Sequence, residues 1–215
     1  RPPRSTPKPS SAASDVYKRQ YQTARKLEFL LHHTYGTILT YYSMIEVQLV
    51  DNQDNPIGAM EKLLAHEKGE RHRALSVLIV NSKNEILLQR RALGKYHSPG
   101  LWTNTCCSHP YPGEDALEAA NRRLKEEMGM SADLEFAFKF QYKCDFENGL
   151  IEHELDHVFV GKTDDTPHIN TDEAMAFSWM SIDDLEANME KSPDDYTFWF
   201  KLIIQQYRKS LKAYF

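Results

Sequence analysis

Cysteine and long apolar runs are both scarce in this chain. Only three cysteines occur, Cys106, Cys107 and Cys144, and two of them are adjacent. Such a set is too small and too clustered for the disulfide framework of a secreted domain, so a reducing compartment is expected. No apolar stretch approaches the roughly 18 residues that span a bilayer. These absences predict a soluble protein of the cytoplasm without a membrane segment.

A surplus of basic residues is also missing. The 26 lysines and arginines are outnumbered by 31 acidic residues, which leaves a formal net charge of −5. Binding to nucleic acid or to an anionic membrane needs an excess of positive charge on one surface, so neither partner is expected. No obligatory protein partner is predicted either. A small anionic substrate is not excluded, because it needs only a local cluster of basic side chains.

The 215 residues, 41% of them hydrophobic, are enough for one well-buried domain. Residues 1–20 are rich in proline, serine and basic residues and hold too little apolar surface to pack. The first methionine is Met44. We therefore expect residues 1–43 to be a disordered or non-native N-terminal extension and residues 44–215 to be the working domain. A targeting segment is the alternative that the composition of the extension leaves open.

Strand and turn signals precede helical signals in the expected working domain. Apolar runs predict strands over residues 45–50, 75–80, 86–88, 136–142 and 155–160. A polar turn between the second and third runs is typical of a β-hairpin. A first helix is predicted over residues 114–128 and is ended by Gly129. A second helix is predicted to begin at Ser181, which caps it, and a third to cover residues 196–214. This order indicates an α/β or α+β fold in which mixed β-sheets are flanked by helices in a single compact domain.

A reactive thiol and an imidazole lie close together just before the first long helix. Cys107 precedes His109 by two residues. A thiol can carry a proton to and from carbon, and a histidine can hold a metal. A Cys-His pair can also be a nucleophile with its base, and a free cysteine is often merely a small buried apolar residue.

The helix from Arg122 to Met130, together with Glu114, resembles the Nudix box. In that family, glutamates bind Mg²⁺, which in turn holds a diphosphate, because carboxylate oxygens suit a hard cation. Two positions depart from the pattern: Ser108 replaces the leading glycine, and Arg123 replaces a glutamate that binds metal in the hydrolases. These changes argue against pyrophosphate hydrolysis and keep Glu127 as the expected Mg²⁺ ligand. The alternative is a solvated helix face of i,i+4 ion pairs.

Several further segments occur in the order seen in type 1 isopentenyl-diphosphate isomerases, a modified Nudix family. The matching segments are Glu61 to His66, His72 to Ala74, Gln89 to Ala92, Pro99 to Pro110 and Glu152 to Glu154. The resemblance covers essentially residues 44–215. It implies an enzyme of isoprenoid biosynthesis that interconverts isopentenyl and dimethylallyl diphosphate by protonation and deprotonation, which moves a carbon–carbon double bond.

The resemblance also implies a set of site residues. The implied catalytic residues are Cys107 and Glu154 as the acid/base pair, assisted by Tyr142. The implied substrate-binding residues are Lys62, Arg91, Lys95 and Arg123 for the diphosphate, and Trp199 for stacking beside the developing cation. Trp102 is expected to shape the wall near Cys107, whereas Arg90 and Arg122 are expected to matter less.

The implied metal ligands form a separate list: His66, His72, His109, Glu152 and Glu154, with Glu127 for the ion that the substrate carries. Three imidazoles and two carboxylates can chelate a divalent ion, and Glu152 and Glu154 project from the same face of a strand. We expect Mg²⁺ with the substrate diphosphate and a second divalent metal, Mn²⁺, Mg²⁺ or Zn²⁺, at the His/Glu site. The competing interpretations are a Nudix diphosphohydrolase and a non-catalytic metal- or nucleotide-binding module.

Overall fold

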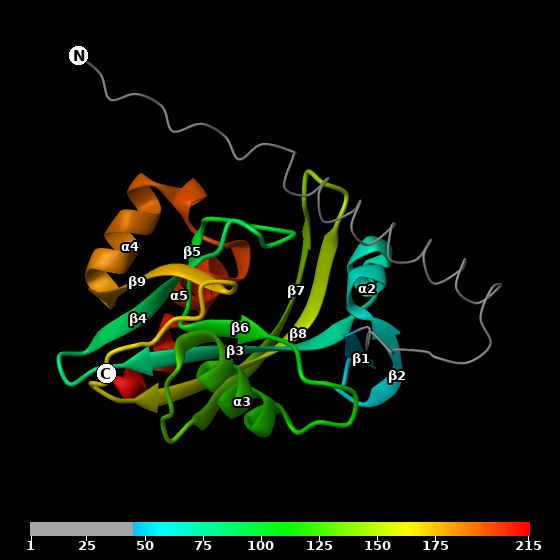
Figure 1. Ribbon diagram of the computed structural model, residues 1–215, viewed down its shortest axis with the longest axis horizontal. Coiled ribbons are helices and arrows are strands. Elements are labelled where there is room, and N and C mark those ends of the chain that lie inside the picture. Colours follow the sequence, from blue (N-terminus) through cyan, green and yellow to red (C-terminus); the bar gives the residue numbers. More distant parts are fainter. Residues whose placement is uncertain (1–44) are drawn as a thin grey trace, which may run out of the picture.

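The structure, a computed structural model, describes residues 45–215 (Figure 1). The expectation for residues 1–43 lies outside the described residues. The strands are β1 (Glu46–Val50), β2 (Pro56–Glu61), β3 (His72–Val80), β4 (Glu85–Arg91), β5 (Trp102–Thr103), β6 (Cys106–Ser108), β7 (Glu135–Asp145), β8 (Ile151–Lys162) and β9 (Ala174–Ser181). The helices are α2 (Lys62–Lys68), α3 (Ala116–Met128), α4 (Ile182–Lys191) and α5 (Phe198–Leu211), with short 3₁₀ turns at Pro193–Asp195 and Lys212–Tyr214.

The strands form one mixed, nine-stranded sheet organised around β3. Strand β3 pairs in parallel with β8 from His72 opposite Glu154 onward, and antiparallel with β6, where Ser76 lies opposite Cys107. Strands β7 and β8 form an antiparallel hairpin that places Tyr142 opposite Glu154. The sheet thereby brings side chains from distant parts of the sequence to one place.

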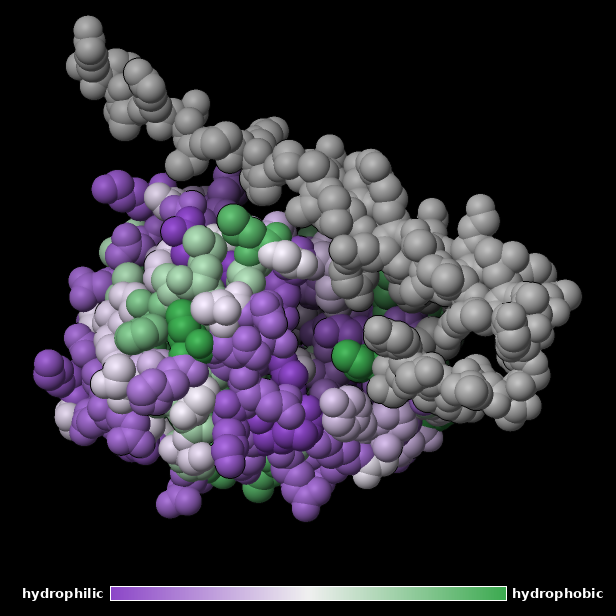
Figure 2. Space-filling model, viewed as in Figure 1, coloured by the Kyte–Doolittle hydropathy of each residue, from purple (hydrophilic) through white to green (hydrophobic). Residues whose placement is uncertain are grey.

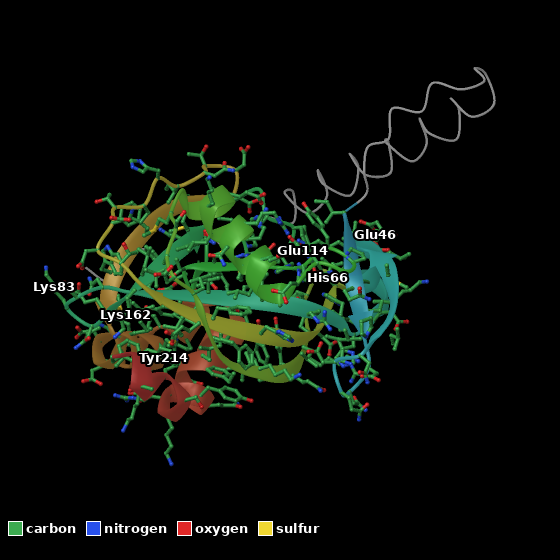
Figure 3. The ribbon with its side chains drawn as sticks, turned by 90° about the horizontal axis from the view of Figure 1, so that it is seen from below. Glu46, His66, Lys83, Glu114, Lys162 and Tyr214 are labelled. Carbon is green, nitrogen blue, oxygen red and sulfur yellow. The ribbon has the colours of Figure 1, made fainter. Side chains whose placement is uncertain are left out.

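Both faces of the sheet are covered, and this explains why β3 is buried along nearly its whole length. Leu78 and Val80 face a core cluster that includes residues of α4 and α5, such as Leu185 and Phe200. Leu75, Val77 and Ile79 face a second cluster under α3, and Figure 3 shows α3 and the C-terminal helices on opposite sides of the sheet. The expected α/β single domain is confirmed. The coloured part of the face seen in Figure 2 is mostly hydrophilic, with separate hydrophobic patches.

Most predicted elements are present, with two kinds of difference. The hairpin expected between β3 and β4 pairs only at Val80 and Ile86, because β3 then pairs with β8 and β6 while β4 pairs with β9. Strand β2 and helix α2 were not predicted, and neither was strand β9. The first contains proline and glycine, and the second is only seven residues long. The two- and three-residue strands β5 and β6 are too short to leave a periodic signal.

Helix α3 has well-defined ends, as the sequence predicts. The Asp115 side chain accepts hydrogen bonds from the amides of Leu117 and Glu118, and Gly129 ends the helix in the left-handed conformation with φ of 63°. A Cβ atom at Gly129 would lie 2.6 Å from the carbonyl oxygen of His168. This close approach ties the last turn of α3 to the segment before β9.

We expect Gly129→Ala to lower the free energy of unfolding by at least about 2 kcal/mol, since it combines left-handed strain with a backbone clash. Urea unfolding monitored by circular dichroism measures this loss. Gly113→Ala is the matched control, because Gly113 has a φ of 80° with no atom near its would-be Cβ. Equal losses in both variants would show that the clash with His168 contributes nothing.

Candidate active site

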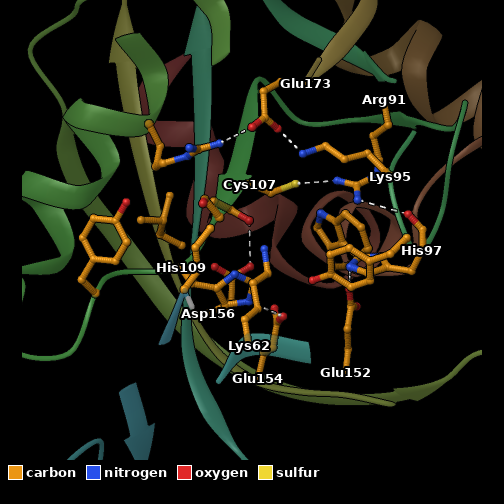
Figure 4. Close-up of a pocket in the computed structure, with 18 of the residues that line it drawn as sticks. Lys62, Arg91, Lys95, His97, Cys107, His109, Glu152, Glu154, Asp156 and Glu173 are labelled. Carbon is orange, nitrogen blue, oxygen red and sulfur yellow. Dashed lines mark hydrogen bonds and ion pairs between the residues drawn. The ribbon is translucent and has the colours of Figure 1, made fainter. Parts of the chain in front are cut away.

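A cavity of about 250 Å³ lies where β3, β6, β7 and β8 meet the loop after β4 (Figure 4). Its walls include most of the residues predicted from the sequence, namely Lys62, Arg91, Lys95, Cys107, His109, Arg123, Tyr142, Glu152, Glu154 and Trp199. Three predicted residues, His66, His72 and Glu127, are buried next to this cavity without being part of its lining. The cavity therefore gathers side chains that are spread over more than half of the sequence.

Four predicted metal ligands converge on one point. Ligand atoms of His66, His72, His109 and Glu154 all lie within 4.8 Å of one another. The Nε2 atoms of the three histidines are 3.9, 3.5 and 3.0 Å from Glu154 Oε1, in that order. Helix α2 supplies the first histidine, β3 the second and the segment after β6 the third, around a carboxylate from β8. The arrangement has the donor types that hold a divalent ion.

The backbone fixes the tautomers of two of these histidines. The Nδ1 atom of His66 is 2.7 Å from the carbonyl oxygen of Lys62, and that of His72 is 2.8 Å from the carbonyl oxygen of Glu70. Each Nδ1–H therefore donates to a carbonyl, which leaves a lone pair on Nε2. Both Nε2 atoms are buried without a hydrogen-bond partner among the described residues. Lone pairs that face a carboxylate oxygen repel it unless a cation lies between them, so these residues fit a metal ion.

The charges of this group also suit a cation. Burial, and then His72, holds the pKa of His66 well below its ordinary value. Burial lowers the pKa of His109 to about 3. Burial alone would raise the pKa of Glu154, but the hydrogen bond from His109 and the neighbouring His72 outweigh it and lower that pKa well below its ordinary value. Neutral imidazoles with an ionised carboxylate are the protonation states that bind metal.

Glu152 belongs to a second, overlapping group with His66 and His97. Its Oε1 atom is 3.3 Å from His97 Nε2, and its carboxyl group is buried. Glu152 and Glu154 share one face of β8, as the sequence predicts, but the carboxylate of Glu152 is turned toward His97. Since His66 has one free lone pair, it can serve only one of the two groups at a time.

Tyr142 joins the two glutamates. Its hydroxyl oxygen is 2.6 Å from Glu154 Oε2 and 3.0 Å from Glu152 Oε2. One hydroxyl proton can be donated to only one of them. Burial and the neighbouring Glu154 raise the pKa of Glu152 well above its ordinary value, and the contact of Glu152 with the hydroxyl is the longer of the two. Tyr142 then donates to the ionised Glu154, and the three groups form a proton-carrying chain.

Cys107 lies on another part of the cavity wall, on β6. Burial raises the pKa of its thiol to about 12, although the guanidinium of Arg91 acts in the opposite direction. The Nη1 atom of Arg91 is 3.5 Å from Sγ, so this cation can stabilise a thiolate when the proton leaves. The adjacent Cys106 faces the opposite core under α3 and is fully buried.

Basic side chains surround the remaining wall of the cavity. The four predicted residues are Lys62, Arg91, Lys95 and Arg123. Burial, and then the charges of Lys95 and Arg123, lowers the pKa of Lys62 to about 8. Glu173 forms ion pairs with Lys95 and with Arg123, the second at 3.0 Å. So many cations crowded around one carboxylate form a site suited to a multiply charged anion.

Two tryptophans occupy different environments. Trp199 lines the cavity, where its Nε1 donates to Asn104 Oδ1 at 3.2 Å and Arg91 lies 5.3 Å from its ring centre. Trp102 was expected to shape the wall near Cys107, and this is wrong. It lies instead against Arg90 and lines a separate small cavity beside Tyr196.

Glu127 lies outside the cavity lining. It is buried, with Arg123 Nη2 at 2.8 Å and Gln89 Nε2 at 2.8 Å from its carboxylate oxygens. The helix spacing of Arg123 and Glu127 thus forms an ion pair, but the pair is largely buried and does not form the solvated helix face that the sequence left open as the alternative. Of the two arginines expected to matter less, Arg90 donates to the carbonyl of Gly100, whereas Arg122 pairs with Glu114 and lines the cavity.

Three acidic or histidine side chains of the cavity had no role predicted from the sequence: His97, Asp156 and Glu173. The period of two along β8, from Glu152 through Glu154, places Asp156 on the same face, but Asp156 matches no ligand of the resembled family and was therefore not predicted. It accepts a hydrogen bond from Ser76 at 2.8 Å, and burial raises its pKa to about 8. His97 and Glu173 lie outside helices and strands, where no periodic pattern indicates which way a side chain points.

Comparisons with known proteins agree on one family. The model of the NUDIX domain family matches residues 70–200. The chain is 54% identical over 159 residues to the isopentenyl-diphosphate Delta-isomerase of Pectobacterium atrosepticum, which covers 74% of this chain and 89% of that protein. It is 50% identical over 154 residues to isopentenyl-diphosphate Delta-isomerase 2 of Aromatoleum aromaticum, covering 72% of this chain and 82% of that protein.

Solved structures share the fold at lower identity. A crystal structure of a Deinococcus radiodurans protein aligns with a TM-score of 0.62 at 18% identity, covering 76% of this chain and 99% of that one. A MutT protein from Methanosarcina mazei aligns with a TM-score of 0.56 at 21% identity, covering 66% of this chain and 96% of that one. These likenesses concern the fold alone.

Proposed function

The chain belongs to the NUDIX domain family and, within it, to the isopentenyl-diphosphate Delta-isomerases, and we propose that its cavity moves a double bond by adding a proton at one carbon and removing a proton at another. It is therefore an isomerase that interconverts isopentenyl diphosphate and dimethylallyl diphosphate. The observation that carries the proposed mechanism is the presence of two separate proton-carrying groups, Cys107 and the Tyr142–Glu154 pair, in the lining of one small cavity.

The cationic wall binds the diphosphate in this proposal. Lys62, Arg91, Lys95 and Arg123 line one cavity and carry more positive charge than Glu173 can balance. Arginine matches the geometry of phosphate oxygens and lysine supplies a point charge. The five-carbon chain then extends toward Cys107, Trp199 and Tyr142.

Proton transfer to an unactivated alkene develops positive charge at a tertiary carbon. In the direction toward dimethylallyl diphosphate, the Tyr142 hydroxyl gives the proton to the terminal carbon while Glu154 and Glu152 hold the tyrosine in place. Cys107 first loses its own proton to solvent, against the burial that raises its pKa; Sγ then removes the other proton, and Arg91 stabilises the thiolate between these two steps. The face of Trp199 and the nearby carboxylates lower the energy of the cationic state. The reverse direction uses the same groups with their proton occupancies exchanged.

Two divalent ions fit the donor groups. His66, His72, His109 and Glu154, with Glu152 beside them, are suited to Mn²⁺, Zn²⁺ or Mg²⁺. When bound there, the ion supplies positive charge that holds Glu154 ionised and in place. Glu127 is the proposed carboxylate for Mg²⁺ that arrives with the diphosphate. We also propose a cytoplasmic enzyme, since all three cysteines are free thiols. Among the described residues, no helix has the length and apolar character needed to cross a membrane.

A diphosphohydrolase is the competing function for this fold. Its metal cluster would need an acidic residue at the position of Arg123, which instead forms an ion pair with Glu127. Incubation with isopentenyl diphosphate and Mg²⁺ distinguishes the two, when product formation is followed by NMR and free phosphate by a colorimetric assay. We expect dimethylallyl diphosphate without phosphate release. Phosphate release without isomerisation would support the hydrolase instead.

A further inference from the structure

His97 is a buried histidine for which the proposed mechanism has no role. It lies in the loop between β4 and β5, is 6% exposed and lines the cavity. Its ring stacks on Phe146 with centroids 5.2 Å apart and meets Trp199 edge to face at 5.8 Å. On its other side, Nε2 is 3.3 Å from Glu152 Oε1. The His97 side chain therefore contacts both the indole of Trp199 and the carboxyl group of Glu152.

The loop that carries His97 is held firmly. Arg91 Nη2 donates to the carbonyl oxygen of His97 at 3.2 Å, and Asn148 Nδ2 donates to the carbonyl oxygen of Tyr96 at 2.9 Å. The first contact ties the loop to a cation of the proposed diphosphate wall, and the second ties it to the turn between β7 and β8. The imidazole thus has a fixed backbone, which is what a side chain needs in order to orient its neighbours.

The hydrogen-bonding arrangement leaves one role for Nε2. The two oxygens of Glu152 face different groups, Oε2 toward Tyr142 and Oε1 toward His97. Tyr142 contacts Oε2 of Glu152, so Oε1 is the oxygen left to accept a hydrogen bond from another group, and a neutral imidazole can donate Nε2–H to it. Without this donor, Oε1 would be a buried acceptor with one partner fewer, and the carboxyl group could rotate away from Tyr142.

We propose that His97 is a positioning residue that holds Glu152 against Tyr142 and holds the edge of Trp199 in the cavity wall. The inference rests on the proposed function, because it concerns the orientation of the groups that deliver the proton and face the cation. His97 does not touch the reacting carbons. It acts through Glu152 and Trp199, so its loss should slow the chemical step more than it weakens diphosphate binding.

Two variants of similar size separate the hydrogen bond from packing. In His97→Gln, the amide nitrogen can reach the position of Nε2 and donate to Glu152, whereas His97→Met fills similar space with a flexible thioether that cannot donate. We expect the Met variant to lose roughly 10- to 100-fold in kcat with KM changed less than about threefold, as for other partners that orient functional groups. The Gln variant should recover most of that loss.

Steady-state kinetics with isopentenyl diphosphate at saturating Mg²⁺ and Mn²⁺ measures kcat and KM of both variants. Melting curves show that both variants remain folded. Calorimetric titration with Mn²⁺ alone gives a second readout, expected to show weaker binding in the Met variant than in the Gln variant. His168→Asn is the control, since His168 is exposed and outside the cavity lining. Equal kcat in the Gln and Met variants would overturn the positioning role. An inactive wild-type protein would instead contradict the proposed function.

Discussion

Replacing Cys107 with alanine should reduce turnover by about two to four orders of magnitude, the usual contribution of a positioned acid or base. The thiol is the group on its part of the wall that can carry a proton, and Arg91 lies 3.5 Å from Sγ to stabilise the thiolate. Alanine keeps the strand and removes only the sulfur. Affinity for Mn²⁺ should be unchanged, because the metal donors come from other residues.

Cys106→Ala is the matched control for this prediction. Its side chain is fully buried under α3, so the variant should lose stability by roughly 1 kcal/mol and keep its turnover. Initial rates and thermal melts of both variants give the comparison. Ordinary turnover in Cys107→Ala would mean that another group removes the proton, and the assignment of Cys107 would be wrong.

Replacing Glu154 with glutamine should have the second large effect, because it disturbs two functions at once. The carboxylate has an Oε1 atom surrounded by three histidine nitrogens and an Oε2 atom 2.6 Å from the Tyr142 hydroxyl. The amide has nearly the same shape but no charge. We expect turnover to fall by at least about 10³-fold and Mn²⁺ affinity to fall by about 10- to 100-fold.

Glu147→Gln tests whether this effect belongs to the site rather than to any loss of negative charge. Glu147 is exposed in the turn between β7 and β8, so this variant should behave like the unaltered protein in both assays. Calorimetry with Mn²⁺ and initial rates at saturating metal supply the two readouts. Unchanged Mn²⁺ affinity in Glu154→Gln would remove the residue from the metal site, and unchanged turnover would remove it from proton transfer.

The sequence predicted which side chains gather at the cavity better than it predicted the elements that carry them. Periodicity identified α3 and the strands that carry Tyr142 and Glu154, because each forms a long amphipathic or buried run. Helix α2, which carries Lys62 and His66, has only seven residues and was missed. Its two site residues were found only through the resemblance of the surrounding segment to a known family.

The directions in which some site side chains point could not be predicted from the sequence. The face of β8 follows from the alternation of side chains, so the shared direction of Glu152 and Glu154 was accessible. The tilt of Glu152 toward His97 depends on where an irregular loop returns to the sheet, and the position of Trp102 depends on packing beside Tyr196. Such long-range contacts have no signature in local spacing.

The most direct test of the account follows the proton itself. Isopentenyl diphosphate is converted by the protein in deuterated water with Mg²⁺ and Mn²⁺, and the product is analysed by mass spectrometry and deuterium NMR. Because the thiol, the hydroxyl and the carboxyl protons all exchange with solvent, the account predicts dimethylallyl diphosphate with deuterium in the newly formed methyl group. Product without deuterium would show that hydrogen moves within the substrate, and this would contradict proton transfer through Cys107 and the Tyr142–Glu154 pair.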